Sequence, residues 1–105
     1  MSKQLKVLVI EDSPQFREFV VEYLLKPNDF SVEVAEDGLS GLSKALKTSP
    51  DLILLDYELP KLNGVGVLRQ LRQRGKKTPV ILMTSNGSEQ LAVEVFQLGV
   101  QNYLV

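Results

Sequence analysis

Short apolar runs alternate along the chain with longer segments in which apolar residues recur at helical spacing. The runs rich in Val, Ile and Leu predict five strands, at residues 5–10, 30–35, 51–55, 79–83 and 101–105. Three of them ("LKVLVI", "DLILL" and "PVILM") lack alternation, which is typical of interior strands of a parallel sheet that are covered on both faces. The run "SVEVA" alternates and therefore predicts a half-exposed edge strand.

Four helices are predicted between these strands. The first has Ser13 as N-cap and Pro14 in the first helical position, and it ends near residues 26–27. Its apolar stripe consists of Phe16, Phe19, Val20, Tyr23 and Leu24. Most of this stripe is expected in the core, and any exposed part would suit docking to the helices of a partner.

The other three helices have similar start and stop signals. The second opens at Asp37-Gly38, and the third runs from Asn63 or Gly64 to Arg74 and is ended by Gly75. The fourth runs from about Gly87 to Leu98 and is closed by Gly99. The residues predicted to face inward are Leu39, Leu42, Ala45 and Leu46 in the second helix, Val65, Leu68 and Leu71 in the third, and Leu91, Val95 and Leu98 in the fourth.

Strands alternating with helices indicate an α/β fold, a doubly wound five-stranded parallel sheet with helices on both faces. A length of 105 residues fits one domain spanning residues 1–105. The chain is 44% hydrophobic and 24% charged, which is typical of a globular protein. No run is long enough to span a membrane or to serve as an export signal, so we expect a cytoplasmic protein.

Charge and residue usage narrow the chemistry. The net charge of -1 gives no general attraction to nucleic acid, and the basic run "RQLRQRGKK" at 69–77 is interpreted as a solvated helix face. The chain has no cysteine and no histidine, which excludes disulfides, thiolate metal sites and histidine bases. Carboxylates, hydroxyls, amides and lysines remain.

Acidic residues follow two of the predicted strands. Glu11 and Asp12 follow the first strand, and Asp56 follows the third. The functional crevice of a doubly wound sheet lies beyond the carboxyl ends of its strands, so these carboxylates should converge. A cluster of like charges made of oxygen ligands indicates Mg²⁺, with the backbone carbonyl of Glu58 as a further ligand. The alternative is that each acidic residue is only a turn former or a solvated cap.

The motifs "VLVIEDS", "DLILLDYELP" followed by "NG", "PVILMTS" and "GVQNYLV" resemble the receiver domain of bacterial two-component response regulators over the whole chain. The resemblance implies a flavodoxin-like, CheY-like sheet in the order 2-1-3-4-5. It also implies that Asp56 is the phosphoacceptor, that Glu11 and Asp12 organise Mg²⁺, and that Thr84 and Tyr103 form a switch.

The implied function is Mg²⁺-dependent transfer of a phosphoryl group to Asp56 from a partner histidine kinase, a phosphotransfer protein or a small phosphodonor. Phosphorylation would draw in the Thr84 hydroxyl and move Tyr103, which changes a surface read by an output domain or protein. Such a chain catalyses at most its own phosphorylation and dephosphorylation. We also expect the side chain of Glu58 to affect the lifetime of the phosphorylated form.

The sequence departs from the family pattern after "YLV". In receiver domains a lysine, a proline and a fifth helix follow, whereas this sequence ends at Val105. We therefore expect a truncated domain that lacks the last helix. The apolar face that this helix would cover predicts a homo-oligomer or an element-swapped dimer.

Two alternatives remain. One is a non-phosphorylated interaction or oligomerisation domain of the same fold, whose activity is impaired by the missing lysine. The other is a hydrolase of the haloacid dehalogenase type, which is disfavoured because the sequence has no Asp-x-Asp motif after the first strand and is too short.

Overall fold

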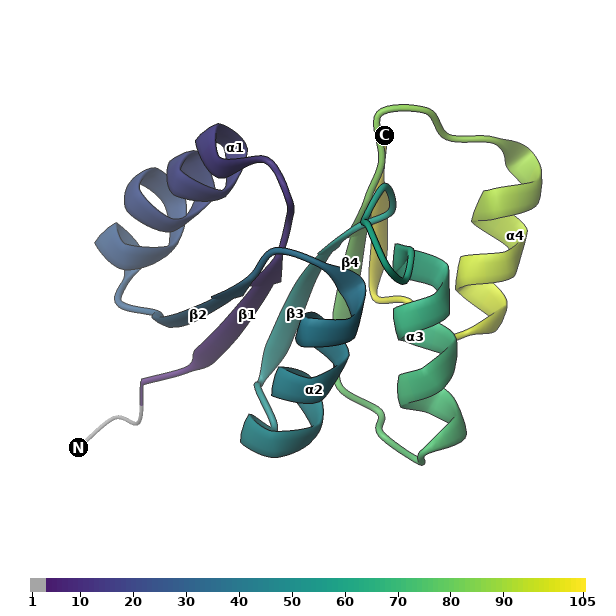
Figure 1. Cartoon of the computed structure of the whole chain (residues 1–105), viewed down its shortest axis with the longest axis horizontal. Helices are drawn as coiled ribbons and strands as arrows, with labels where there is room; N and C mark the ends of the chain where they lie inside the picture. Colours follow the sequence, from purple (N-terminus) through teal and green to yellow (C-terminus); the bar gives the residue numbers. More distant parts are fainter. Residues whose placement is uncertain (1–3) are drawn as a thin grey trace.

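In the computed structural model, which describes residues 4–105, five parallel strands form one sheet in the order β2-β1-β3-β4-β5 (Figure 1). This confirms the predicted fold class and strand order. The strands are β1 (Lys6–Ile10), β2 (Ser31–Ala35), β3 (Leu52–Asp56), β4 (Val80–Met83) and β5 (Asn102–Leu104). The helices are α1 (Pro14–Phe19), α2 (Gly38–Thr48), α3 (Gly64–Gln73) and α4 (Glu89–Gln97), and α1 continues into a π-helical turn (Val20–Leu25) and a 3-10 turn (Lys26–Asn28).

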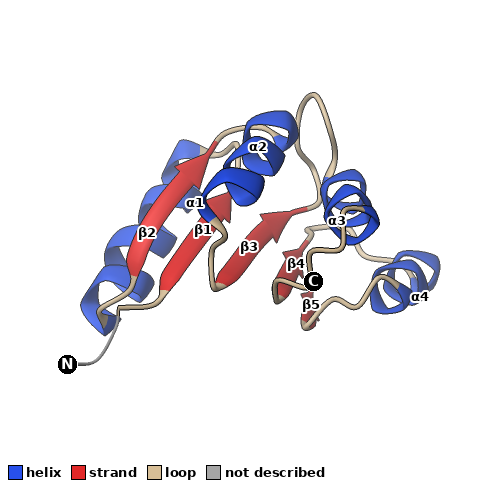
Figure 2. Cartoon of the chain, turned by 90° about the horizontal axis from the view of Figure 1, so that it is seen from below, coloured by secondary structure: helices blue, strands red, loops and turns tan. Residues whose placement is uncertain are grey.

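The helices lie on both faces of the sheet, with α1 on one face and α2, α3 and α4 on the other (Figure 2). Two separate sets of buried side chains reflect this division. The larger set includes Leu8, Ile53 and Leu82 and packs under α2–α4, whereas Val7 and Val9 pack against the α1 side. The two-sided helical arrangement was predicted from the sequence.

Each α-helix is started by a polar side chain that accepts a backbone N–H in the first turn, which satisfies a group that no helical carbonyl can reach. The caps are Ser13, Asp37, Asn63 and Ser88. Ser13 was predicted as a cap, and Asp37 and Asn63 were predicted only as positions where a helix begins. The fourth lies one residue later than the predicted start at Gly87.

The burial of the interior strands differs from the prediction. Only β1 is buried along most of its length, whereas β3 and β4 alternate between buried and half-buried positions. The half-buried residues Leu54, Ile81 and Met83 lie on the face that α1 covers only in part. The prediction that these strands are buried on both faces is therefore wrong for β3 and β4.

The first helix also differs from the prediction. Phe16, Phe19, Tyr23 and Leu24 are all exposed, and Val20 and Leu25 are the buried residues of this segment. The π-helical turn explains the change, because Val20 and Leu25 are five residues apart and a π turn brings positions five apart onto the same face. An uninterrupted α-helix would have placed Val20 with Tyr23 and Leu24 instead.

Leu39 was predicted to face inward and is 53% exposed. The buried face of α2 is centred on Gly38, Gly41, Leu42 and Ala45. Gly41 lets the helix approach the sheet closely, since a Cβ at this position would lie 2.6 Å from Ile10 Cδ1 of β1, whereas Gly38 lies against Leu62 in the loop after β3. Leu39 follows Gly38 in the helix and points away from that face, so its side chain is exposed to solvent. The α-helices among residues 4–105 are all too short and too polar to cross a membrane.

Candidate functional site

A cavity of about 590 Å³ opens at the carboxyl end of the sheet, above β1, β3 and β4. Because parallel strands end at one edge, the segments that follow them meet there. The cavity is lined by Glu11, Asp12, Ser13, Phe16, Asp56, Glu58, Met83, Thr84, Ser85, Leu104 and Val105. All the acidic candidates from the sequence and Thr84 thus line one cavity, whereas Tyr103 does not.

Three carboxylates meet in this cavity. One oxygen from each of Glu11, Asp12 and Asp56 lies within 4.8 Å of the others. Glu11 is buried, Asp56 is half-buried and Asp12 is exposed. Burial of Asp56, followed by the adjacent carboxylate of Glu11, raises the pKa of Asp56 to about 8. Ionisation of all three carboxyl groups at once is therefore unfavourable. Their oxygen atoms fit a hard divalent cation, which would relieve the repulsion.

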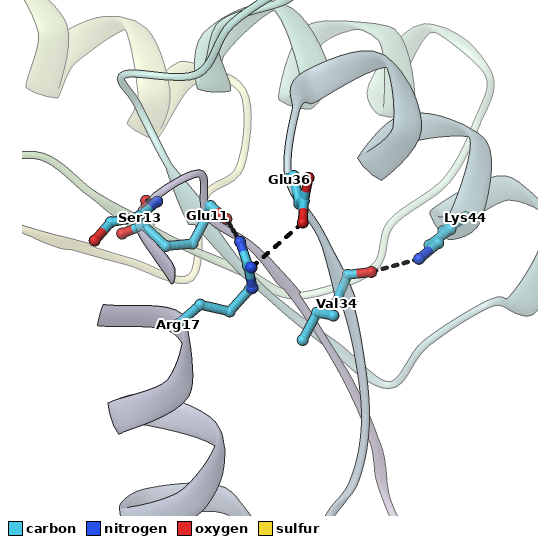
Figure 3. Close-up of polar contacts among 6 residues, drawn as sticks. All are labelled: Glu11, Ser13, Arg17, Val34, Glu36 and Lys44. Carbon is cyan, nitrogen blue, oxygen red and sulfur yellow. Dashed lines mark hydrogen bonds and ion pairs between the residues drawn. The ribbon is translucent and has the colours of Figure 1, made fainter. Parts of the chain in front are cut away.

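Arg17 fixes the loop that carries Glu11 and Asp12. Its guanidinium lies between two loops, where Nη1 donates to the backbone carbonyl of Glu11 at 2.8 Å and Nη2 pairs with Glu36 Oε1 at 3.4 Å (Figure 3). The Arg17 side chain is only 16% exposed. The sequence analysis missed this residue, although a cation one turn into the helix that follows an acidic loop is a usable signal.

Glu58 and Thr84 contact each other across the cavity. The Thr84 hydroxyl donates to Glu58 Oε1 at 2.9 Å, and Ser85 Oγ lies 3.5 Å from the same oxygen. The backbone N–H of Asn86 donates to Thr84 Oγ1 at 3.1 Å. Glu58 also faces Asp56, because its backbone N–H lies 3.4 Å from Asp56 Oδ1. The expected role of the Glu58 carbonyl as a metal ligand stays a prediction.

Gly64 allows the loop after β3 to fold tightly onto Asp56. Its N–H donates to the carbonyl of Tyr57 at 2.9 Å. A Cβ at Gly64 would lie 2.5 Å from the Asp56 carbonyl oxygen, so the backbone approach requires glycine. Leu62 N–H donates to the carbonyl of Pro60 at 2.8 Å, which closes a turn within the same loop. The segment "P…NG" in the sequence thus shapes the wall beside Asp56.

Tyr103 lies on the α2–α4 side of the sheet, away from the cavity. Its ring contacts Phe96 of α4 edge to face, with centroids 6.4 Å apart. The hydroxyl is buried and has no hydrogen-bond partner within residues 4–105. It lies under the β4–α4 loop, where a Cβ on Gly87 would come within 2.5 Å of the hydroxyl oxygen. The role of Tyr103 as a switch stays a prediction.

Known proteins similar to this chain include transcriptional regulators. The chain is 36% identical over 104 residues to the transcriptional regulatory protein ResD of Bacillus subtilis (strain 168), covering 99% of this chain and 42% of ResD. It is 36% identical over 101 residues to the transcriptional regulatory protein CusR of Escherichia coli (strain K12), covering 96% of this chain and 44% of CusR. The chain thus spans less than half the length of these relatives.

Solved structures share the fold. The signal receiver domain of a putative Luxo repressor protein from Vibrio parahaemolyticus superposes with a TM-score of 0.91 at 31% identity, covering 97% of this chain and 78% of that chain. The chemotaxis protein CheY4 of Vibrio cholerae gives a TM-score of 0.88 at 30% identity, covering 98% and 87%. A family model described as "Response regulator receiver domain" matches residues 7–105. With an acidic cavity at the carboxyl edge of a 2-1-3-4-5 sheet, the chain belongs to the response regulator receiver domain family.

Proposed function

We propose that the chain is a phosphoacceptor module that takes a phosphoryl group onto Asp56 in a Mg²⁺-dependent reaction. The observation that carries the proposal is the position of the Asp56 carboxylate, which shares one cavity with Glu11, Asp12 and Thr84. Glu11, Asp12 and Asp56 would hold the ion. When bound, Mg²⁺ supplies positive charge that screens the carboxylates from an anionic phosphodonor.

The chain's own residues would perform the transfer by positioning. An ionised Asp56 oxygen attacks the phosphorus of a partner's phosphohistidine, the P–O bond forms and the P–N bond breaks, and the electron pair returns to the imidazole. No base in the chain is needed because an ionised carboxylate carries no proton. The Thr84 hydroxyl would then donate to the new phosphoryl group, and Tyr103 would move with the β4–α4 loop.

Exposed apolar residues on the first helical segment support a protein phosphodonor, a histidine kinase or a phosphotransfer protein. Phe19 and Tyr23 stack at 5.6 Å on the open face of the first helical segment, where both are at least half exposed. Side chains of this kind suit docking to an apolar helix face. On the other side, Val93 and Phe96 of α4 are exposed and Phe96 contacts Tyr103, which supports a switched surface for an output domain or protein.

A second association surface is proposed at the carboxyl end of β5. Leu104, Val105 and Phe16 are 48%, 80% and 42% exposed and all line the cavity. Exposed apolar groups of this size favour covering by a second copy of the chain. Light scattering of residues 1–105 should show a dimer at a protein concentration of about 0.1 mM, which is high enough to populate a weak dimer. A strictly monomeric chain at that concentration would argue against it.

The phosphoacceptor function is tested by incubating the chain with Mg²⁺ and acetyl phosphate. The expected product is an acid-stable, base-labile adduct of one phosphoryl group, seen by mass spectrometry and absent in Asp56→Asn. Asp51→Asn is the matched control, because Asp51 precedes the same strand at the opposite edge of the sheet. An adduct that persists in Asp56→Asn would refute the assignment, and no adduct on any chain would support the non-phosphorylated interaction domain.

A further inference from the structure

Thr84 is a buried residue with a single hydroxyl hydrogen, and that hydrogen is already used. Thr84 is 5% exposed, and its hydroxyl donates to Glu58 Oε1 at 2.9 Å. A threonine hydroxyl donates one hydrogen bond at a time. While Glu58 accepts this bond, Thr84 has no hydrogen to offer to a group on Asp56.

Glu58 lies between the two groups that would have to interact. Its backbone N–H points toward Asp56 Oδ1, and its side chain reaches Thr84 on the neighbouring strand's loop. Its carboxylate lines the same cavity as Asp56. A phosphoryl group on Asp56 would carry about two negative charges beside that carboxylate, and like charges repel each other.

From these contacts we propose that Glu58 is a positioning residue that holds the Thr84 hydroxyl in the resting chain and must release it before Thr84 can bind a phosphoryl group. The Glu58–Thr84 hydrogen bond is a latch that competes with phosphorylation. The proposal rests on the phosphoacceptor function of Asp56 and adds a regulatory role for Glu58 in the same site.

The latch also connects to the β4–α4 loop. Thr84 Oγ1 accepts the backbone N–H of Asn86 at 3.1 Å, so one hydroxyl joins Glu58 to the start of that loop. Rotation of the Thr84 side chain away from Glu58 breaks or redirects both contacts. Release of the latch therefore reaches the loop that covers the Tyr103 hydroxyl, where a Cβ on Gly87 would meet it.

The first measurement needs no ligand. Three-bond couplings from the Thr84 methyl carbon report its χ1 rotamer by NMR in the wild-type chain, Glu58→Gln, Glu58→Ala and the control Glu89→Gln. Glu89 is an exposed carboxylate in the first turn of α4. We expect one rotamer in wild type, in Glu58→Gln, which keeps an acceptor, and in the control, and rotamer averaging in Glu58→Ala. If Thr84 keeps the same single rotamer in Glu58→Ala, the latch proposal is wrong.

The second measurement is the affinity for beryllofluoride, a mimic of the phosphoryl group, in the presence of Mg²⁺. We expect Glu58→Ala to bind about fivefold to tenfold more tightly than wild type, with Glu58→Gln between them and Glu89→Gln unchanged. In a Thr84→Ala background the gain from Glu58→Ala should shrink, since no hydroxyl remains to be released. An equal gain in both backgrounds means that Glu58 acts by charge alone and refutes the latch.

The two proposals fail in different ways. If no chain binds beryllofluoride or gains a phosphoryl group while the Thr84 rotamer still responds to Glu58→Ala, the phosphoacceptor function is wrong and the Glu58–Thr84 bond is only a structural contact. If wild type binds beryllofluoride with the same affinity as Glu58→Ala, the phosphoacceptor function stands and the latch is wrong.

Discussion

Asp56 lies in a cluster of carboxylates that repel one another in the absence of a cation. Its replacement by asparagine tests how much this cluster lowers the free energy of unfolding. Burial, followed by the adjacent carboxylate of Glu11, raises the pKa of Asp56 to about 8. In the unfolded chain the same carboxyl has an ordinary pKa of about 3.9. Between these values the folded chain binds more protons at this position than the unfolded chain does.

The direction of the pH dependence follows from that difference. Where the folded state binds more protons than the unfolded state, the free energy of unfolding falls as the pH rises. The contribution of Asp56 is therefore fully present below about pH 4, is lost as the pH rises toward 8 and is absent above it. An asparagine side chain cannot ionise, so Asp56→Asn should remove this part of the pH dependence and stabilise the metal-free chain at pH 8.

The expected size is modest because the cavity is open. Asp56 is only half-buried, and water screens the repulsion at an open site. We expect Asp56→Asn to raise the free energy of unfolding by about 1–2 kcal/mol at pH 8 without metal. For a domain of this length, that corresponds to a rise in Tm of about 5–10 °C.

The assay is urea unfolding followed by circular dichroism at pH 5 and pH 8, with EDTA or with Mg²⁺. Wild type in EDTA should lose stability from pH 5 to pH 8, and Mg²⁺ should restore it more in wild type than in Asp56→Asn. Glu33→Gln removes one negative charge at an exposed position of β2 and serves as the control. Equal pH slopes for wild type and Asp56→Asn in EDTA would refute the reasoning.

Three further substitutions test single contacts. Tyr103→Phe removes a buried hydroxyl that has no partner within residues 4–105, so urea unfolding should show unchanged stability or a gain of up to about 1 kcal/mol; a loss above that size would mean that the hydroxyl is bonded. Gly64→Ala places a Cβ 2.5 Å from the Asp56 carbonyl and should cost about 1–3 kcal/mol in the same assay, whereas a neutral effect would mean that the loop yields freely. Arg17→Ala removes the bond that holds the β1–α1 loop, so calorimetry should show weaker Mg²⁺ binding by about fivefold to tenfold; an unchanged affinity would show that Arg17 does not organise the acidic residues.

The strand order and the meeting of the acidic residues were accessible from the sequence because they depend on periodicity and topology. Parallel strands end at one edge, so carboxylates that follow β1 and β3 have to approach each other whatever the details of packing. The caps were accessible for a similar reason. Ser13, Asp37 and Asn63 each precede a periodic segment and have a side chain that accepts a first-turn N–H.

Two of the errors concern which side of a helix is buried. A hydrophobic stripe at helical spacing predicted a buried Phe16 and Tyr23, yet one π-helical turn moved the buried face to Val20 and Leu25. At Leu39 the error came from glycine, since hydropathy does not show that Gly41 lets the helix pack closely on the sheet. Neither signal is visible in apolar periodicity.

The Glu58–Thr84 and Arg17–Glu11 contacts were not predicted because they depend on side-chain conformation across two loops. The sequence placed Glu58 and Thr84 near the site and suggested that Glu58 has an effect worth testing, but it could not choose between a free carboxylate and one bonded to Thr84. Arg17 is seven residues beyond the end of β1 and reaches back to the loop before its own helix. This contact depends on the direction in which α1 runs relative to that loop.

The site and the switch share one physical feature, a set of polar groups whose best partners are not in the resting chain. Asp56 is crowded by Glu11, the Thr84 hydroxyl is held by Glu58, and the Tyr103 hydroxyl is buried without a partner within residues 4–105. The crowded Asp56 carboxyl and the unpartnered Tyr103 hydroxyl each lower the stability of the resting state, whereas the Glu58–Thr84 hydrogen bond stabilises it and is lost when Thr84 turns to a phosphoryl group. A cation would supply positive charge to the carboxylates, and a phosphoryl group would give Thr84 a new acceptor in place of Glu58. The two states of the domain can therefore lie within a few kcal/mol of each other, which is the condition for a phosphoryl group to shift the population.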